Sequence, residues 1–342
     1  MDISPRTSAY VVKELLKRGM PYLVFEKFGQ AKPLPKNSTK SISFRRYFLD
    51  MGGADFTPYG YYNYTHMDPV NAELTEGVTP TAINLAKQDI TATLTQYGSL
   101  VTISDVIMDT HEDPVLKEAV EVLGEQAAVI LEKARFNILK ACSNVFYANG
   151  SARSDVNTVF TVGLQRKVVR ALKRNLAKPI TSIVRSTPAY GTEPIAPAFI
   201  AVCHPDLEYD IRNATGFTPA EKYGTVSSWE GEIGKIGDVR YILSTICEPY
   251  PDAGATGGTN VISTSGSNAD VYPIIYIARD AYGIVPLKGK NAIVPMVVNP
   301  TPSDSDPLAQ RGHVSWKAMQ TTVILNDAWM AVAEVACTDD LS

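Results

Sequence analysis

Several features of common protein classes are missing from this sequence, and each absence narrows what the chain can be. No run of about eighteen apolar residues, the length that a membrane-spanning helix needs, occurs in it. The chain does not begin with a basic segment followed by an apolar stretch, so we expect no secretory signal and assume synthesis in the cytosol. An integral membrane protein is therefore excluded, and we expect no membrane partner.

The sequence is also poor in residues that bind metals or form disulfides. Its four cysteines, Cys142, Cys203, Cys247 and Cys337, lie far apart and form no C-x-x-C pair. This spacing argues against a zinc cluster and a disulfide framework, and it fits a reducing compartment. The four histidines are widely separated too. We therefore expect neither a metal ion nor another cofactor.

Motifs of nucleotide-binding enzymes and hydrolases are absent as well. The sequence contains no G-x-x-x-x-G-K-[ST], no G-x-G-x-x-G after a strand and no G-x-S-x-G. Cys203 adjoins His204, but neighbouring residues of a strand point to opposite faces, which favours a buried cysteine beside a turn histidine. His111, Glu112 and Asp113 directly precede a predicted helix, and capping of that helix explains Asp113. We therefore predict no catalytic residues.

The charge of the chain is small in sum but uneven along its length. The 32 basic and 36 acidic residues give a net charge of −4. The first 50 residues hold ten basic and four acidic residues, a local charge of +6, and residues 131–190 hold eleven and two, a local charge of +9. Such polarity favours a surface that meets a polyanion or an acidic partner, although a solvated helix face would produce the same pattern.

The strongest local signals are helical. In residues 113–141, Asp113 and Pro114 suit a helix start, and apolar residues then recur at spacings of three or four, which predicts one long helix. A shorter helix is predicted at 7–18 and another at 161–177, the latter with leucine and valine on one face. The other face of this last helix is basic, with Arg166, Lys167, Arg170, Lys173 and Arg174.

The remaining segments have the composition of strands and loops. Residues 42–108 are rich in tyrosine, threonine and β-branched residues, and an extended tract of this kind rarely folds alone, so it suits a contact with another subunit. From residue 197 onward, strand-like runs alternate with short helical ones, and residues 252–270 predict a flexible excursion. The fold class is α+β.

Five stretches that span almost the whole chain carry a family resemblance. They are FRRYF at 44–48, LTEGVTP at 74–80, the passage QYGSLVTISD…EKARFNIL at 96–139, AVCHPDLEYDIRN at 201–213 and the closing GHVSWKAMQTTVILNDAWMAVAEVA. With the order of their surroundings, they resemble tailed-phage (Caudoviricetes) major capsid proteins of the Hong-Kong-97-type fold, in the large N4-type phage coat family.

The resemblance implies a division into five parts. These are an N-terminal arm at 1–41, an extended β-rich E-loop with flanking strands at 42–108, a spine helix region at 109–150, a peripheral (P) domain at 151–195 and 271–342, and an axial (A) domain at 196–270.

The resemblance also implies a structural function. We expect a major capsid protein, not an enzyme, that self-assembles as hexamers and pentamers into an icosahedral shell around double-stranded DNA. Its place is the virion capsid, after assembly in the cytoplasm of a bacterial host. The chain has no room for a scaffolding segment before the spine, so we expect a separate scaffolding protein, together with a portal, and a decoration protein is a further candidate partner. We place no catalytic acid for a Lys–Asn cross-link and predict no such bond.

Two sets of contact residues follow from the same resemblance. The basic face of helix 161–177, namely Arg166, Lys167, Arg170, Lys173 and Arg174, is expected to face the packaged DNA without reading its sequence. Aromatic and basic residues of the E-loop region are expected at contacts between subunits: Arg45, Arg46, Tyr47, Phe48, Tyr59, Tyr61, Tyr62 and Tyr64.

Two alternatives stay open at this point. A cellular nanocompartment shell of the same fold would enclose an enzyme in place of a genome. An uncharacterised hydrolase would use Cys203 or the pair Glu112 and Asp113.

Overall fold

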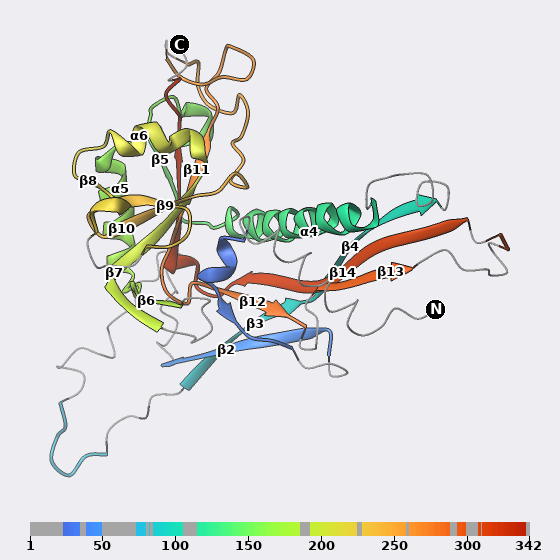
Figure 1. Ribbon diagram of the computed structural model, residues 1–342. Helices are drawn as coiled ribbons and strands as arrows, with labels where there is room; N and C mark the ends of the chain where they lie inside the picture. Colours follow the sequence, from blue (N-terminus) through green and yellow to red (C-terminus); the bar gives the residue numbers. More distant parts are fainter. Residues whose placement is uncertain are drawn as a thin grey trace.

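The computed structural model has a mixed lobe at one end of a long helix, with long strands running beside that helix (Figure 1). It describes the following residues: 23–34, 39–49, 73–79, 82, 85–104, 115–184, 192–223, 228–257, 260–287, 293–298, 307–308 and 310–339. The helix expected at 7–18 and the helix start expected at Asp113 and Pro114 lie outside these residues.

The long helix α4 spans Val115–Leu139 and confirms the helix expected over 113–141. Its apolar positions recur at helical spacing and bury one stripe, which includes Leu123, Ala127 and Leu131. This stripe packs on Trp316 and its neighbours in a sheet, so α4 is held along much of its length by long-range contacts.

The sheet beneath α4 has five strands in the described part of the chain. They are β4 (Thr95–Ser104), β14 (Arg311–Ile324), β13 (Ile293–Val298), β12 (Tyr282–Pro286) and β1 (Gln30–Ala31). The long strand β14 pairs antiparallel with β4 along one edge and with β12 and β13 along the other. Alternate residues of β14 face α4, as the two-residue period of a strand requires.

The lobe is built on a second sheet of eight strands, in the order β5-β15-β11-β7-β10-β9-β8, with β6 paired to β7. The bounds are β5 (Val145–Tyr147), β6 (Ile180–Val184), β7 (Thr192–Cys203), β8 (Phe217–Pro219), β9 (Glu232–Ile236), β10 (Val239–Leu243), β11 (Tyr272–Ile277) and β15 (Met330–Val335).

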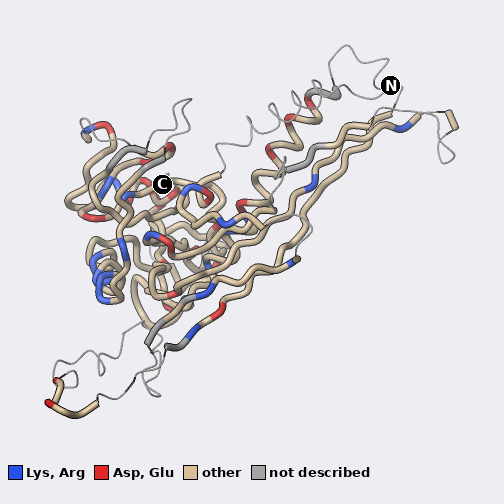
Figure 2. The backbone as a smooth tube through the Cα atoms, turned by 90° about the horizontal axis from the view of Figure 1, so that it is seen from below, with Lys and Arg blue, Asp and Glu red and all other residues tan. Residues whose placement is uncertain are grey.

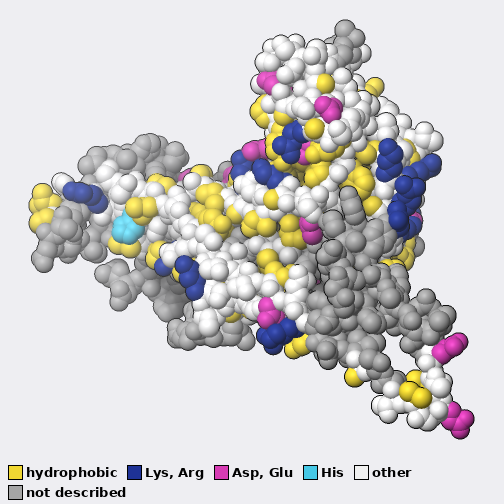
Figure 3. All heavy atoms as spheres, turned by 180° about the vertical axis from the view of Figure 1, so that it is seen from behind, with side chains coloured by type: hydrophobic (Ala, Val, Ile, Leu, Met, Phe, Trp, Pro, Cys, Tyr) yellow, Lys and Arg dark blue, Asp and Glu magenta, His cyan; other side chains and the backbone are white. Residues whose placement is uncertain are grey.

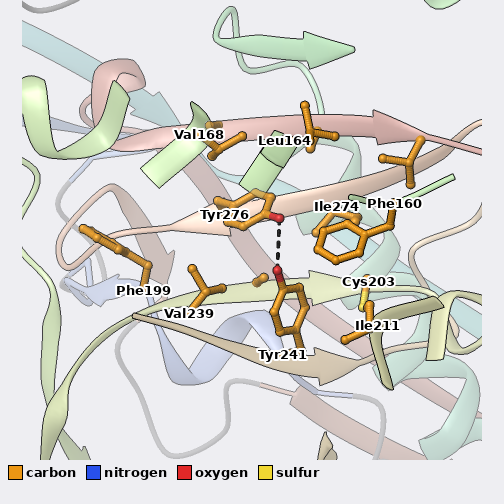
Figure 4. Packing of buried hydrophobic residues seen from close by; sticks show 14 of the residues in the cluster. Phe160, Leu164, Val168, Phe199, Cys203, Ile211, Val239, Tyr241, Ile274 and Tyr276 are labelled. Carbon is orange, nitrogen blue, oxygen red and sulfur yellow. Dashed lines mark hydrogen bonds between the residues drawn. The ribbon is translucent and has the colours of Figure 1, made fainter. Parts of the chain in front are cut away.

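The central strands of this sheet are buried on both faces. Ile200 and Val202 of β7 face the core that contains Phe136 of α4, whereas Ala201 and Cys203 face a second core. In this second core the hydroxyls of Tyr241 and Tyr276 lie 3.3 Å apart and share one hydrogen bond (Figure 4). Burial on both faces explains why these strands read as continuous apolar runs.

The longest helix of the lobe agrees with the sequence pattern. Helix α5 (Val162–Arg174) confirms the helix expected at 161–177, and the Thr161 hydroxyl caps it by accepting the Leu164 N–H at 3.2 Å. The other short helices in the described part of the chain are η2 (Phe25–Lys27), η4 (Arg153–Asp155), η5 (Pro205–Leu207), α6 (Glu208–Arg212), η6 (Ala220–Lys222) and η7 (Asp327–Trp329).

A two-stranded ribbon projects beside the five-stranded sheet. Its strands β2 (Ser41–Leu49) and β3 (Leu85–Thr93) pair antiparallel along their whole length. Ile42 and Phe44 pack on the apolar cluster at its root, while the intervening residues face away. The β structure expected in 42–108 is confirmed where β2, β3 and β4 lie, whereas the described residues 73–79 form a turn.

The excursion expected to be flexible at 252–270 is organised by two carboxylates. Asp252 Oδ1 accepts the Ser265 N–H at 3.0 Å, and Asp270 Oδ1 accepts the N–H groups of Asp252 and Thr264 at 2.7 and 3.1 Å. The composition of this segment predicts a loop, whereas its ordering by two aspartates depends on contacts that no local pattern shows.

The two sheets cross the domain limits expected from the resemblance. β11 and β15 were expected in the P domain, yet they join the same sheet as β9 and β10 of the expected A domain. β4 and β1, expected in the E-loop and N-arm segments, join the sheet beneath α4. Strand pairing between distant segments leaves no mark in local composition, so each sheet draws strands from more than one of the expected parts, and the five-part division stays a prediction.

No helix in the described part of the chain is both long and apolar enough to cross a membrane.

Candidate interaction surfaces

The cysteine singled out in the sequence lies in the core. Cys203 ends β7, is fully buried, and its Sγ lies 3.8 Å from the Ile242 carbonyl oxygen. Burial raises the pKa of the Cys203 thiol well above its ordinary value. His204 caps the following turn, where its Nδ1 accepts the Asp206 N–H at 3.3 Å. Cys203 is therefore a packing residue, as expected, and a buried thiol of raised pKa is a poor nucleophile.

The other sequence candidates give no reactive cluster. Cys142, Cys247 and Cys337 are buried free thiols. Glu112 and Asp113 lie outside the described residues. Among the residues that the structure describes, no three His, Cys, Asp or Glu side chains gather in a way that could hold a metal ion.

Helix α5 carries an exposed basic face on the outside of the lobe. Its apolar face, with Leu164, Val168 and Leu172, packs into the core and is fully or almost fully buried. The five predicted basic residues, Arg166, Lys167, Arg170, Lys173 and Arg174, are all exposed. They form the blue cluster at α5 in Figure 2 and the dark blue column at one edge of the molecule in Figure 3. The sequence pattern therefore placed these cations together correctly.

A groove of about 800 Å³ runs along α5. One wall is a helical stripe of α5, which includes Val162, Gln165, Arg166, Val169, Arg170, Lys173 and Arg174. The opposite wall comes from two turns that lie far away in the sequence, Thr215 with Gly216 and Ile236 with Gly237 and Asp238. Asp238 forms an ion pair with Lys173 across the groove. We call this feature the α5 groove.

A buried polar side chain lies in the wall of the α5 groove. Gln165 is 4% exposed, and its Nε2 donates to the Ile236 carbonyl oxygen at 2.7 Å. Its Oε1 is buried and has no hydrogen-bond partner in the described part of the structure. Sequence reasoning missed this residue because the turn that closes the groove lies some distance along the chain, and no local pattern links the two.

The projecting ribbon presents a second candidate surface. Arg45 and Asp89 form a bidentate ion pair across its strands, with Nε–Oδ1 and Nη2–Oδ2 distances of 2.8 and 3.0 Å. This contact raises the pKa of Arg45 and lowers that of Asp89. Tyr47 is 57% exposed on the same face. The side chains of Arg46 and Phe48, and all of Tyr59, Tyr61, Tyr62 and Tyr64, lie outside the described residues.

The segment Leu23–Leu34 connects α4 with both sheets, and sequence reasoning missed how it does so. Glu132 of α4 is fully buried and accepts the N–H groups of Val24 and Phe25 at 2.7 and 2.5 Å. Arg135 pairs with Glu132 at 2.8 Å. Burial is the main cause of a raised pKa of Glu132, and Arg135 opposes it. A single glutamate in a helix gives no sequence signal for this role.

The two-stranded ribbon and the cationic α5 groove are surfaces suited to contacts with other molecules. The sequence model of the family described as "Phage capsid protein" matches residues 87–335, and the chain belongs to this family. It is a major capsid protein and a structural protein, not an enzyme.

Solved structures of low sequence identity to this chain have a similar fold. The capsid protein of Ralstonia phage GP4 is 12% identical, with a TM-score of 0.65 over 93% of this chain and 92% of that chain. The capsid protein of cyanophage Pam1 is 12% identical, with a TM-score of 0.62 over 99% and 94%. The expected Hong-Kong-97-type fold is confirmed, whereas the narrower N4-type assignment stays a prediction.

A shell protein of another kind shares the fold. The encapsulin complex of Synechococcus elongatus is 11% identical, with a TM-score of 0.51 over 94% of this chain and 88% of that chain. No curated protein matches the sequence closely enough to count as a relative. The fold therefore does not separate a capsid from a nanocompartment, and the family match decides for the capsid.

Proposed function

We propose that this capsid protein assembles as hexamers and pentamers into an icosahedral shell that encloses a double-stranded DNA genome. The family match over residues 87–335 carries the proposal. The projecting ribbon supports it, because two strands that extend from the body need a neighbouring surface to cover them. Closed shells of identical subunits supply such neighbours by symmetry.

The proposal includes partners and a place of assembly. The shell forms in the cytoplasm of a bacterial host, with a separate scaffolding protein and a portal, and a decoration protein is a further candidate partner. The N-arm, E-loop, spine, P and A divisions remain our assignment, with the spine at α4. The ribbon residues Arg45, Arg46, Tyr47 and Phe48, with Tyr59, Tyr61, Tyr62 and Tyr64, are assigned to contacts between subunits.

The basic face of α5 is assigned to the packaged DNA. Five exposed cations on one helix attract phosphates through charge alone, so the contact needs no base recognition. Such contacts release counterions and weaken as salt rises.

Sedimentation velocity with negative-stain imaging tests the assembly directly. The protein expressed alone, and then with its native neighbours, should give uniform shells or capsomer-sized rings. A stable monomer or dimer under both conditions would contradict the proposal. Shells that enclose a protein cargo and no DNA would favour the nanocompartment.

Charge reversal tests the DNA contact. Replacing Arg170, Lys173 and Arg174 by Glu should reduce DNA retention in filled shells and change its salt response. The control reverses three exposed cations outside α5, at Lys178, Lys222 and Arg279. Unchanged retention in the α5 variant would remove the DNA-facing assignment while leaving the shell function intact.

A further inference from the structure

The α5 groove contains apolar side chains as well as cations, and a contact with a DNA phosphate would use only the cations. Its lining includes Arg166 and Arg170, which attract anions of any kind. It also includes the half-buried Val162 and Val169 and the buried Ile236, which together make up its apolar floor. A duplex presents phosphates and sugars on its outside, and phosphates gain nothing from an apolar floor.

The buried amide of Gln165 sets a second requirement. Its Oε1 is an acceptor without a partner among the described residues, and buried polar atoms of this kind are normally satisfied. Phosphate and carboxylate oxygens are acceptors, so they cannot satisfy another acceptor. A peptide backbone N–H is a donor and can do so.

The far wall of the groove leaves room for a backbone to approach. Gly216 and Gly237 have φ of +88° and +57°, and a Cβ built on either would meet no atom within 4 Å. The groove volume of about 800 Å³ falls in the range of ligand sites, roughly 300–1,000 Å³. The groove therefore has space for a short peptide.

We propose that the α5 groove binds an acidic, amphipathic peptide segment of another protein. Carboxylates of the peptide pair with Arg166 and Arg170, its apolar side chains cover Val169, and a backbone N–H donates to Gln165 Oε1. The inference rests on the proposed function, because the α5 cations that pair with the peptide are the ones assigned to DNA. DNA would then displace the peptide from these cations. Electrostatic attraction to the α5 cations speeds the binding of both the acidic peptide and DNA. The apolar floor of the groove and the Gln165 amide favour the peptide.

Binding measurements on the assembled or capsomeric protein test the proposal. The probe is a fluorescein-labelled amphipathic peptide with Glu on one face and Leu on the other. One matched peptide has Gln for Glu, a second has Ser for Leu, and a short labelled duplex represents DNA. The first peptide should bind better than both matched peptides by about tenfold or more.

Two kinds of protein variant separate the peptide site from the DNA surface. Gln165→Met and Val169→Ser should each weaken peptide binding, Gln165→Met by about tenfold, and leave duplex binding unchanged. Arg166→Gln with Arg170→Gln should weaken both. Thermal unfolding of each variant checks that it is folded. If Gln165→Met is unstable, the change at the half-buried Val169 provides a second test.

The outcomes distinguish this inference from the proposed function. Equal binding of all three peptides, or insensitivity of the amphipathic peptide to both Gln165→Met and Val169→Ser, would overturn the peptide site and leave a purely electrostatic DNA surface. Duplex binding that ignores the arginine changes would overturn the DNA-facing assignment, whatever the peptide does.

Discussion

At the scale of single residues, one buried glutamate connects parts of the fold that are distant in sequence. Glu132 lies on α4, yet both of its backbone donors belong to the segment that begins at Leu23. Arg135 completes the group and also donates to Gln320 Oε1 of β14 at 2.9 Å. The group therefore fixes the N-terminal segment against α4 and against the sheet beneath it.

Removing the carboxylate should be costly. Glu132→Leu leaves two backbone N–H groups without their acceptor and removes the buried carboxylate that pairs with Arg135, which keeps only Gln320 and the exposed Glu26. We therefore expect a loss of about 3–5 kcal/mol in the free energy of unfolding. Glu118→Leu is the matched control on the exposed face of the same helix and should cost at most about 1 kcal/mol. Denaturant unfolding of the two variants compares them, and equal losses would contradict the role of Glu132.

The same residue gives a pH dependence with a defined sign. Burial raises the folded-state pKa of Glu132 above its ordinary value of 4.5. The folded state therefore binds the proton more tightly, and this contribution to stability is full below pH 4.5 and is lost as pH rises through the raised pKa.

Glu132→Gln cannot titrate, so it should lack this loss. Its free energy of unfolding, measured relative to the unchanged protein, should rise from about pH 4 towards neutral pH. Denaturant melts of both proteins at several pH values measure this difference. A difference that stays constant with pH would mean that Glu132 does not titrate in the folded state as its burial requires.

At the scale of elements, the sequence was a good guide to helices and a poor guide to sheets. The long helix was expected at 113–141 and spans Val115–Leu139, because its apolar spacing is a local property. The order of the eight-stranded sheet joins β5, β11 and β15 from distant segments, and strand pairing of this kind depends on partners that no local pattern names. The α5 cations could be predicted because helical spacing is a local property. The groove beside them was missed because its opposite wall comes from distant segments.

The contact of α4 with its sheet provides a prediction with an adjacent control. Leu123 is 2% exposed and packs on the cluster around Trp316, whereas Val122 is 54% exposed. Leu123→Ala should lower the free energy of unfolding of the isolated subunit by about 2–5 kcal/mol, because it leaves a cavity between helix and sheet. Val122→Ala should change it by no more than about 0.5 kcal/mol. Denaturant unfolding checks both, and similar losses would mean that α4 is not packed in this way.

At the scale of the whole molecule, some exposed side chains suit a contact with other copies better than packing within the subunit. The root of the ribbon is held by Ile42 and Phe44, but Ser43, Arg45 and Tyr47 on its opposite face point away from the body. A large aromatic side chain that is 57% exposed adds little to the stability of the single subunit. Tyrosine is, however, enriched at protein interfaces, where its truncation is often costly.

Tyr47 therefore separates subunit stability from shell assembly. Tyr47→Ala should change the free energy of unfolding of the subunit by less than about 0.5 kcal/mol. If Tyr47 contacts a neighbour, the same change should raise the critical concentration for assembly by roughly tenfold or more, since each subunit in the shell loses the contact. Ser43→Ala, on the same exposed face of β2, is the matched control and should leave both quantities unchanged.

Sedimentation of a concentration series measures the assembly threshold, and denaturant unfolding measures the free energy of unfolding of the subunit. A variant that unfolds more easily yet assembles normally would place Tyr47 in internal packing, and one that changes neither quantity would remove it from the contact surface of the ribbon.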